Sequence, residues 1–142
     1  MSDEHRRLEF RCSGIGAELE LYLDPDPFIY GAQVGGRATS GDFSGAAHEF
    51  FPPADLRVFV VGLETLLAGQ ADEAVLTNAF GPSRLRLQVS PTDSTGHSAI
   101  RATMKSIGLA HANSAEITVG LDYGDVLTLA RRVQKCLELN AR

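Results

Sequence analysis

Hydrophobic and polar residues alternate along much of this chain, and the period of the alternation changes twice from two to about 3.6 residues. Residues 17–23 place leucines on one side and glutamates on the other, as in a strand with one buried face. Similar two-residue periods cover residues 84–89, 97–105 and 117–121, and weaker ones cover residues 8–12, 29–38, 42–51 and 73–79. The pattern therefore predicts eight strands.

Two segments carry the period of an amphipathic helix. The first lies between Pro53 and Gly69, and the second covers residues 123–139. Six apolar positions and a leading aspartate recur with a constant offset of seventy residues, from Asp55 in the first segment to Asp125 in the second. This favours an internal duplication over the coincidence of two unrelated amphipathic helices.

The order of these elements predicts an α+β fold made of two ββββα halves, about residues 7–69 and 73–141, within one domain spanning residues 1–142. Short connections favour a mainly antiparallel sheet with one solvated face and one face covered by the two helices. Only a turn separates the halves, so we expect one shared core. Gly31, Gly35 and Gly36 predict a bulge or a sharp bend within the third strand.

The first helix also carries a second apolar patch, formed by Val58, Val61 and Gly62. A helix that is apolar on more than one side is usually covered on more than one side. Packing against the second helix is the preferred interpretation, and a partner protein is the alternative.

The composition is that of an ordinary globular domain, with 44% hydrophobic residues, 22% charged residues and a net charge of −5. This balance argues against a nucleic-acid binder, and the basic residues Arg84, Arg86, Arg101 and Lys105 lack interleaved aromatic residues. No apolar run approaches the ~20 residues of a membrane-spanning helix. The N-terminus lacks a signal-peptide core, so we expect a cytoplasmic protein without a membrane partner.

The sequence contains two cysteines, Cys12 and Cys136. A disulfide between them is conceivable, but the expected cytoplasmic setting argues against it. Cys136 falls on the apolar stripe of the second helix, which predicts that its thiol packs in the core.

No recognisable catalytic, metal or nucleotide motif occurs in the sequence. The four histidines (His5, His48, His97 and His111) show no spacing typical of metal ligands. Residues 36–41 have the glycines of a phosphate loop, but Asp42 stands where the lysine belongs. In residues 41–45 the serine of a nucleophile elbow is displaced by one position. The sequence therefore predicts a protein that is not an enzyme and needs no cofactor or metal.

Acidic residues along one predicted strand form the best candidate binding surface. Glu18 and Glu20 share one strand face at roughly 7 Å, the distance set by strand rise. The regular alternation favours a solvated face over a catalytic pair. Arg84 and Arg86, in the corresponding strand of the second half, are candidates to pair with these glutamates.

Three groups of residues carry a family resemblance: residues 41–45 (Gly-Asp-Phe-Ser-Gly), residues 49–51 (Glu-Phe-Phe), and the helix that begins at Asp55 with apolar residues at 56, 59, 63 and 66. With the strands at 85–89, 96–100 and 117–121 and the closing helix, the chain resembles the WapI-like immunity proteins over about residues 41–139. The resemblance implies a small cytoplasmic protein, without catalytic residues, that binds and neutralises a secreted bacterial toxin.

The partner implied by this resemblance is a toxin domain, bound by a monomer or a homodimer. A toxin that attacks nucleic acid would be basic, so charge complementarity makes the acidic strand and turn the expected contact surface: Glu18, Glu20, Tyr22, Asp24 and Asp26. Two alternatives remain open. One is a small-ligand or enzymatic domain whose site forms only on folding, with His97 or His48. The other is a structural protein that self-associates through a sheet edge or the first helix.

Overall fold

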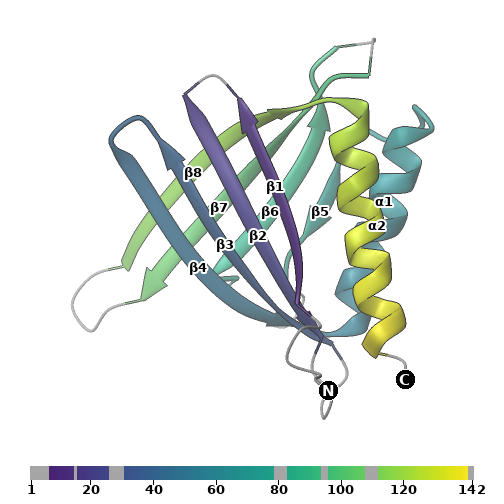
Figure 1. Ribbon diagram of the computed structural model, residues 1–142, viewed down its shortest axis with the longest axis horizontal. Helices are drawn as coiled ribbons and strands as arrows, with labels where there is room; N and C mark the ends of the chain where they lie inside the picture. Colours follow the sequence, from purple (N-terminus) through teal and green to yellow (C-terminus); the bar gives the residue numbers. More distant parts are fainter. Residues whose placement is uncertain are drawn as a thin grey trace.

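The computed structural model describes residues 7–14, 16–25, 31–78, 83–93, 96–107 and 112–140. Its elements follow the predicted order (Figure 1). The first half contains β1 (Leu8–Gly14), β2 (Ala17–Pro25), β3 (Ala32–Ser40), β4 (Phe43–Phe51) and α1 (Pro53–Leu67). The second half contains β5 (Ala74–Leu76), β6 (Leu85–Pro91), β7 (Ser98–Ile107), β8 (Ala112–Leu121) and α2 (Tyr123–Asn140). The predicted α+β fold with two ββββα halves is confirmed.

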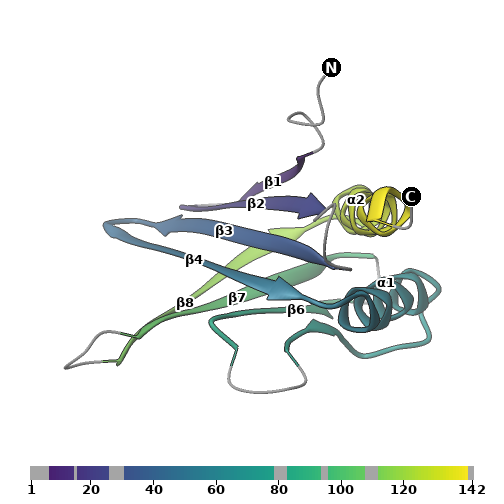
Figure 2. The ribbon, with the colours of Figure 1, turned by 90° about the horizontal axis from the view of Figure 1, so that it is seen from below.

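The strands form two separate sheets, one from each half, with the orders β1-β2-β3-β4 and β5-β6-β7-β8. Every pair of neighbouring strands is antiparallel. Figure 2 shows the sheets as two layers, with both helices along the same side. Each sheet is therefore covered on its inner face by the other sheet as well as by helices, whereas the sequence pattern had predicted helices alone.

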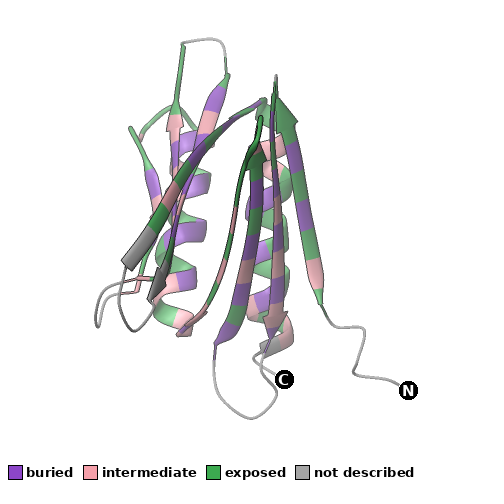
Figure 3. Cartoon of the chain, turned by 90° about the vertical axis from the view of Figure 1, so that its left-hand side faces the viewer, coloured by how far each residue is buried: buried purple, intermediate pink, exposed green. Residues whose placement is uncertain are grey.

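Alternate strand residues supply the core between these layers. In β2, Leu19, Leu21 and Leu23 are buried, and in β6 Leu85 and Leu87 are buried. The apolar stripes of the two helices join them in one hydrophobic cluster that draws on both halves. Figure 3 shows the resulting alternation of buried and exposed residues along the strands. The outward positions of both sheets are consequently free to carry binding groups.

Each helix packs mainly against the first strands of the other half. Helix α1 contacts β5 and β6, α2 contacts β1 and β2, and the two helices contact each other. A Cβ atom on Gly62 of α1 would lie 2.9 Å from the Cβ of Ala74 in β5, so the close approach requires glycine. On the other side, Nε of Arg132 in α2 donates a hydrogen bond of 3.0 Å to the carbonyl of Glu9 in β1.

This arrangement divides the second apolar patch predicted on α1. Gly62 is covered within the chain, but by β5 rather than by the second helix that was expected to cover it, and Val58 and Val61 are 66% and 60% exposed. The second helix does not cover these two valines.

Of the predicted bulge or sharp bend in the third strand, the bulge is wrong, and Gly31, whose φ is 128°, forms a bend immediately before the strand. Strand β3 pairs with both neighbours without interruption from Ala32 to Ser40. Gly36 faces inward, where a Cβ atom would lie 3.2 Å from Cδ1 of Leu85, so this glycine lets the two sheets approach closely. Gly35 faces outward and lies on the outer surface of the sheet.

The two helices begin differently. In α2, Asp122 and Asp125 cap each other: the backbone N–H of Asp125 donates to Oδ1 of Asp122 at 2.8 Å, and the N–H of Asp122 donates to Oδ2 of Asp125 at 3.1 Å. In α1, Pro52 is the N-cap without a side-chain hydrogen bond, and Pro53 opens the helix. Of the residues that the structure describes, no helix is long and apolar enough to cross a membrane.

Both cysteines are buried free thiols. Cys136 is fully buried in the core, as its position on the apolar stripe predicts. Burial raises the pKa of both thiols to about 12, because the low-polarity surroundings disfavour the thiolate.

Candidate functional site

The structure places four of the five predicted binding residues together. Glu18, Glu20, Tyr22 and Asp24 alternate with the buried residues of β2, and all four lie on the outer face of the first sheet. Asp26 lies outside the described residues. The period-two pattern thus identified a real shared surface.

Arginines from the neighbouring strands change the charge of this surface. Glu20 is paired in register with Arg11 of β1 and Arg37 of β3. Asp24 accepts hydrogen bonds of 3.2 and 3.1 Å from Nε of Arg7, whose Nη2 lies 3.0 Å from Oδ2. The outer face of the first sheet is therefore a mixed-charge surface rather than an acidic one.

The predicted pairing of Arg84 and Arg86 with the glutamates is wrong. Arg86 belongs to the other sheet, where Nη1 donates a hydrogen bond of 2.9 Å to Oε1 of Gln88. The backbone N–H of Arg84 donates to the carboxylate of Glu49. Strands that correspond in the two halves lie in different sheets, so their outward residues do not meet.

Tyr22 lies at the centre of the first sheet's outer face and is held from two directions. Its hydroxyl donates a hydrogen bond to Oε2 of Glu20, and the guanidinium carbon of Arg7 lies 5.5 Å from its ring centroid. The hydrogen bond lowers the pKa of Glu20, which Arg11 and Arg37 lower further. The same hydrogen bond raises the pKa of Tyr22. Both pKa shifts favour the state in which Glu20 is ionised and accepts a hydrogen bond from the neutral hydroxyl of Tyr22.

A hollow opens beside Tyr22 because residue 35 has no side chain. Two adjoining depressions, of about 410 and 250 Å³, share Tyr22, Gly35 and His48 among their lining residues. A Cβ atom on Gly35 would lie 3.9 Å from Cδ2 of Tyr22 and 4.0 Å from Cβ of His48, which is ordinary van der Waals contact. We call this depression the Gly35 hollow.

The walls of the Gly35 hollow combine an aromatic ring, an imidazole and charged groups. Arg7, Asp24 and Gln33 line one part, and Arg37 lines the other. Tyrosine and arginine are the side chains most often found at the energetic centres of protein interfaces. The hollow thus suits a side chain inserted from a partner. Sequence reasoning missed it because it depends on the register of three strands.

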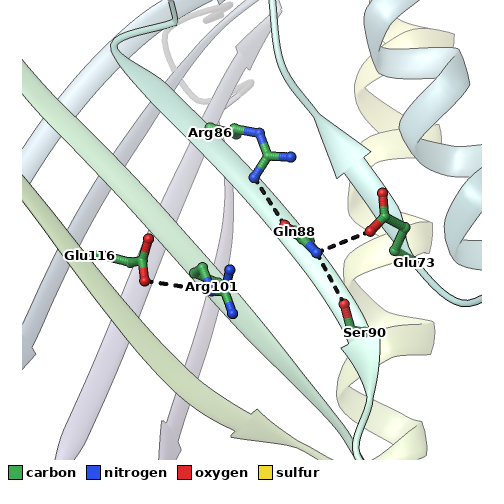
Figure 4. A network of polar contacts seen from close by, with 6 residues as sticks. All are labelled: Glu73, Arg86, Gln88, Ser90, Arg101 and Glu116. Atoms are coloured by element: carbon green, nitrogen blue, oxygen red, sulfur yellow. Dashed lines mark hydrogen bonds and ion pairs between the residues drawn. The ribbon is translucent and has the colours of Figure 1, made fainter.

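The outer face of the second sheet is covered by polar side chains that bind one another (Figure 4). Gln88 accepts from Arg86 and donates to Oε1 of Glu73 at 3.1 Å and to Oγ of Ser90 at 3.4 Å. Nε of Arg101 lies 3.7 Å from the carboxylate of Glu116. The basic residues predicted here are therefore interleaved with acidic and amide groups.

A third depression, of about 510 Å³, lies where the C-terminus of α1 meets the start of α2. Nδ1 of His97 lies 3.0 Å from Oδ2 of Asp93, and Asp72 and Tyr123 also contribute to the lining. The other predicted candidate, His48, belongs to the Gly35 hollow instead. Within the described segments, no three His, Cys, Asp or Glu side chains gather in an arrangement that could hold a metal ion.

Comparisons with known proteins bear on the fold alone. The sequence matches no protein-family model, and no curated protein matches it. Among solved structures, the chain is similar to the plant transcriptional regulator PBF-2, with a TM-score of 0.51 and 10% sequence identity. The alignment covers 92% of this chain and 80% of that protein. At this level of identity, the similarity shows that the two chains share a fold.

Proposed function

We propose that this chain is a non-catalytic protein-binding module that neutralises a bacterial toxin domain in the cytoplasm, and that it binds the toxin with the outer face of the first sheet. The observation that carries the proposal is the Gly35 hollow, flanked by Tyr22 and His48 on the outer face of the first sheet. The toxin as partner comes from the resemblance to the WapI-like immunity proteins.

Two of the side chains around the hollow, Tyr22 and Arg7, already make contacts within the chain. Tyr22 is held by Glu20 and Arg7, and Arg7 is itself held by Asp24. Ordering a free side chain at an interface costs about 0.5–1.5 kcal/mol, so side chains ordered in advance favour binding. A partner side chain can then contact the tyrosine ring with little rearrangement of this face.

The charge of the face suits a partner with both signs of charge at its rim. Glu18 is paired in register with Ser13 and Thr39, so it has no arginine directly beside it. Glu20 and Asp24 are both accompanied by arginines. Complementarity to a basic toxin, expected from the sequence, therefore rests chiefly on Glu18.

The test is neutralisation of the toxin domain encoded beside this gene, scored as growth of bacteria that express both proteins. Gly35→Val fills the hollow with a residue that strands favour, and Gly120→Ala is the control, since a Cβ on Gly120 has no neighbour within 4 Å. We expect the wild type and Gly120→Ala to restore growth and Gly35→Val to restore it poorly. Calorimetry with the purified proteins should show affinity reduced at least about tenfold.

Each part of the proposal can fail separately. If no neighbouring gene product is toxic, or if the wild-type chain does not restore growth, the immunity function is wrong. If Gly35→Val and Glu18→Lys both bind as tightly as the wild type, the toxin is bound elsewhere on the molecule. Glu18→Lys is the cleaner charge reversal, because Glu20→Lys also removes the hydrogen bond that holds Tyr22.

A second candidate function, binding of a small molecule, is favoured by the depression around His97. It combines an imidazole and two aspartates with apolar residues of both helices. This agrees with the general form of ligand pockets, which are mainly apolar with a few polar groups. A thermal-shift screen of small amines and acids tests it: stabilisation that is lost in His97→Ala supports the site, and no stabilisation by any compound counts against it.

The transcriptional role stated for PBF-2 is not carried over to this chain. Similarity at 10% identity concerns the fold alone, and the same fold hosts unrelated functions. The net charge of −5 and the mixed charges of both outer faces favour a protein partner over nucleic acid.

A further inference from the structure

The open edge of β4 borders the Gly35 hollow, whose lining includes Ala46 and His48, but pairing at this edge uses backbone groups and is independent of the proposed function. The backbone of an antiparallel strand bonds alternately to its two sides, so the register fixes which residues face outward. The N–H of Gly41 donates to the carbonyl of Gly16 at 3.1 Å. In this register, the backbone N–H and C=O groups of the odd-numbered residues of β3 bond to β2. The even-numbered residues of β3 therefore bond to the odd-numbered residues of β4.

Ser44, Ala46, His48 and Phe50 consequently direct their backbone N–H and C=O groups away from β3. The side-chain amide of Asn78 donates to the carbonyl of Phe50 at 3.3 Å, which agrees with this direction and closes that end of the edge. Within the part of the chain that the structure describes, the backbone groups of Ser44, Ala46 and His48 find no partner. A stretch of about five residues is thus left available for pairing.

The other edge strands differ from β4 because they carry features that discourage pairing. Strand β5 has three residues only. Strand β1 carries Glu9 and Arg11 on its open edge, and Arg132 donates a hydrogen bond to the backbone carbonyl of Glu9. Strand β8 carries Glu116. In β4, residues 43–48 contain no Asp, Glu, Lys, Arg or Pro.

We propose that β4 pairs with β4 of a second copy of this chain, antiparallel about Ala46, and so joins the two first sheets into one continuous sheet. The open backbone groups are themselves symmetric about Ala46: Ser44 of one copy meets His48 of the other, and Ala46 meets its counterpart. Apart from His48, which meets Ser44, the side chains of residues 44–48 are small and uncharged, so the pairing brings no like charges together and leaves room for the second strand. Phe43, which is 79% exposed at the end of this stretch, lies where the second copy would cover it.

The symmetry supplies a sharp test, because residue 46 must meet itself. Ala46→Lys and Ala46→Glu each place like charges opposite one another in the dimer, and each should weaken self-association at least about tenfold. An equimolar mixture places lysine opposite glutamate and should restore the dimer. Ala46→Ser is the control, since it changes the side chain without adding charge.

The measurement is molar mass by sedimentation as a function of protein concentration. With increasing protein concentration, the molar mass of the wild type and of Ala46→Ser should rise from 15.2 kDa toward twice that mass. The molar mass of each charged variant, measured separately, should remain at 15.2 kDa. The molar mass of the mixture of charged variants should rise again, a result that unfolding of the variants would not produce. A wild type that stays at 15.2 kDa at all concentrations, charged variants that dimerise like the wild type, or a mixture that stays monomeric would each overturn the proposal.

Discussion

Gly62 of α1 faces Ala74 of β5 so closely that a Cβ atom added to the glycine would lie 2.9 Å from the Cβ and 3.1 Å from the Cα of the alanine. This contact joins the helix of the first half to the first strand of the second half. It lies between two backbones, neither of which can move without displacing its neighbours.

Gly62→Ala should therefore destabilise the protein although alanine favours a helix. Overpacking at a contact this short costs about 1–3 kcal/mol, which outweighs the ~1 kcal/mol gained in helix propensity. Urea unfolding should show a lower free energy of unfolding, and Ala74→Gly in the same chain should recover part of the loss. An unchanged or raised stability in Gly62→Ala would contradict the close packing of α1 on β5.

The hydrogen bond between Tyr22 and Glu20 predicts a shifted titration. Because the neutral phenol donates to a carboxylate, the pKa of Tyr22 is raised above that of an ordinary tyrosine. Glu20→Gln removes the negative charge and should bring the transition to lower pH in an ultraviolet titration of tyrosinate. Tyr22→Phe identifies which transition belongs to Tyr22. Identical curves for the wild type and Glu20→Gln would mean that the bond does not form in solution.

The buried thiols predict a loss of stability in alkali. Their pKa is about 12 in the folded chain against a reference value of 9.0, so above pH 9 the unfolded chain loses protons that the folded chain keeps. Stability contributed by each thiol is complete below pH 9 and falls by about 1.4 kcal/mol per pH unit until pH 12.

The comparison variant is Cys12→Ala/Cys136→Ala, which retains every other group that titrates in alkali. Urea unfolding at a series of pH values should show a steeper alkaline decline for the wild type than for this variant. Equal slopes would indicate that the thiols are not buried as described. In the same samples, alkylation of both native thiols by iodoacetamide should be slow at neutral pH and become fast on unfolding.

The reciprocal cap of α2 predicts a local loss of helix stability. Asp122→Ala removes the acceptor for the N–H of Asp125 and should cost about 1 kcal/mol. Asp122→Asn should cost less, because an amide oxygen can still accept this bond. Calorimetric melting of the three proteins gives the comparison. A melting temperature of Asp122→Ala equal to that of the wild type would show that the cap contributes nothing.

Local patterns were sufficient to predict the elements of this fold. The alternation of Leu19 and Leu21 with Glu18 and Glu20 predicted both a strand and its exposed face. The helix between Pro53 and Gly69 was marked by residues that start and stop helices, and α1 ends at Leu67. These signals are carried by residues a few positions apart, so no knowledge of tertiary structure is needed to use them.

The candidate site depends on relationships that such patterns do not contain. Arg11 and Arg37 come to lie beside Glu20 only through the register of three strands, and the period of two shows which residues share a face but not which residues are neighbours. Gly35 was interpreted as part of a bulge for the same reason. Its position between Tyr22 and His48 emerges only when β2, β3 and β4 are aligned.

Each helix packs mainly on strands of the other half, and this arrangement suggests how such a chain could arise by duplication. Within a single ββββα unit the strands would cover little of the apolar stripe of the helix, whereas two identical units could cover each other's helices. A gene of half this length would therefore encode an obligate dimer whose stability falls on dilution. The turn from Gly69 to Glu73 converts that association into an intramolecular one, at an effective concentration that no longer depends on the amount of protein present.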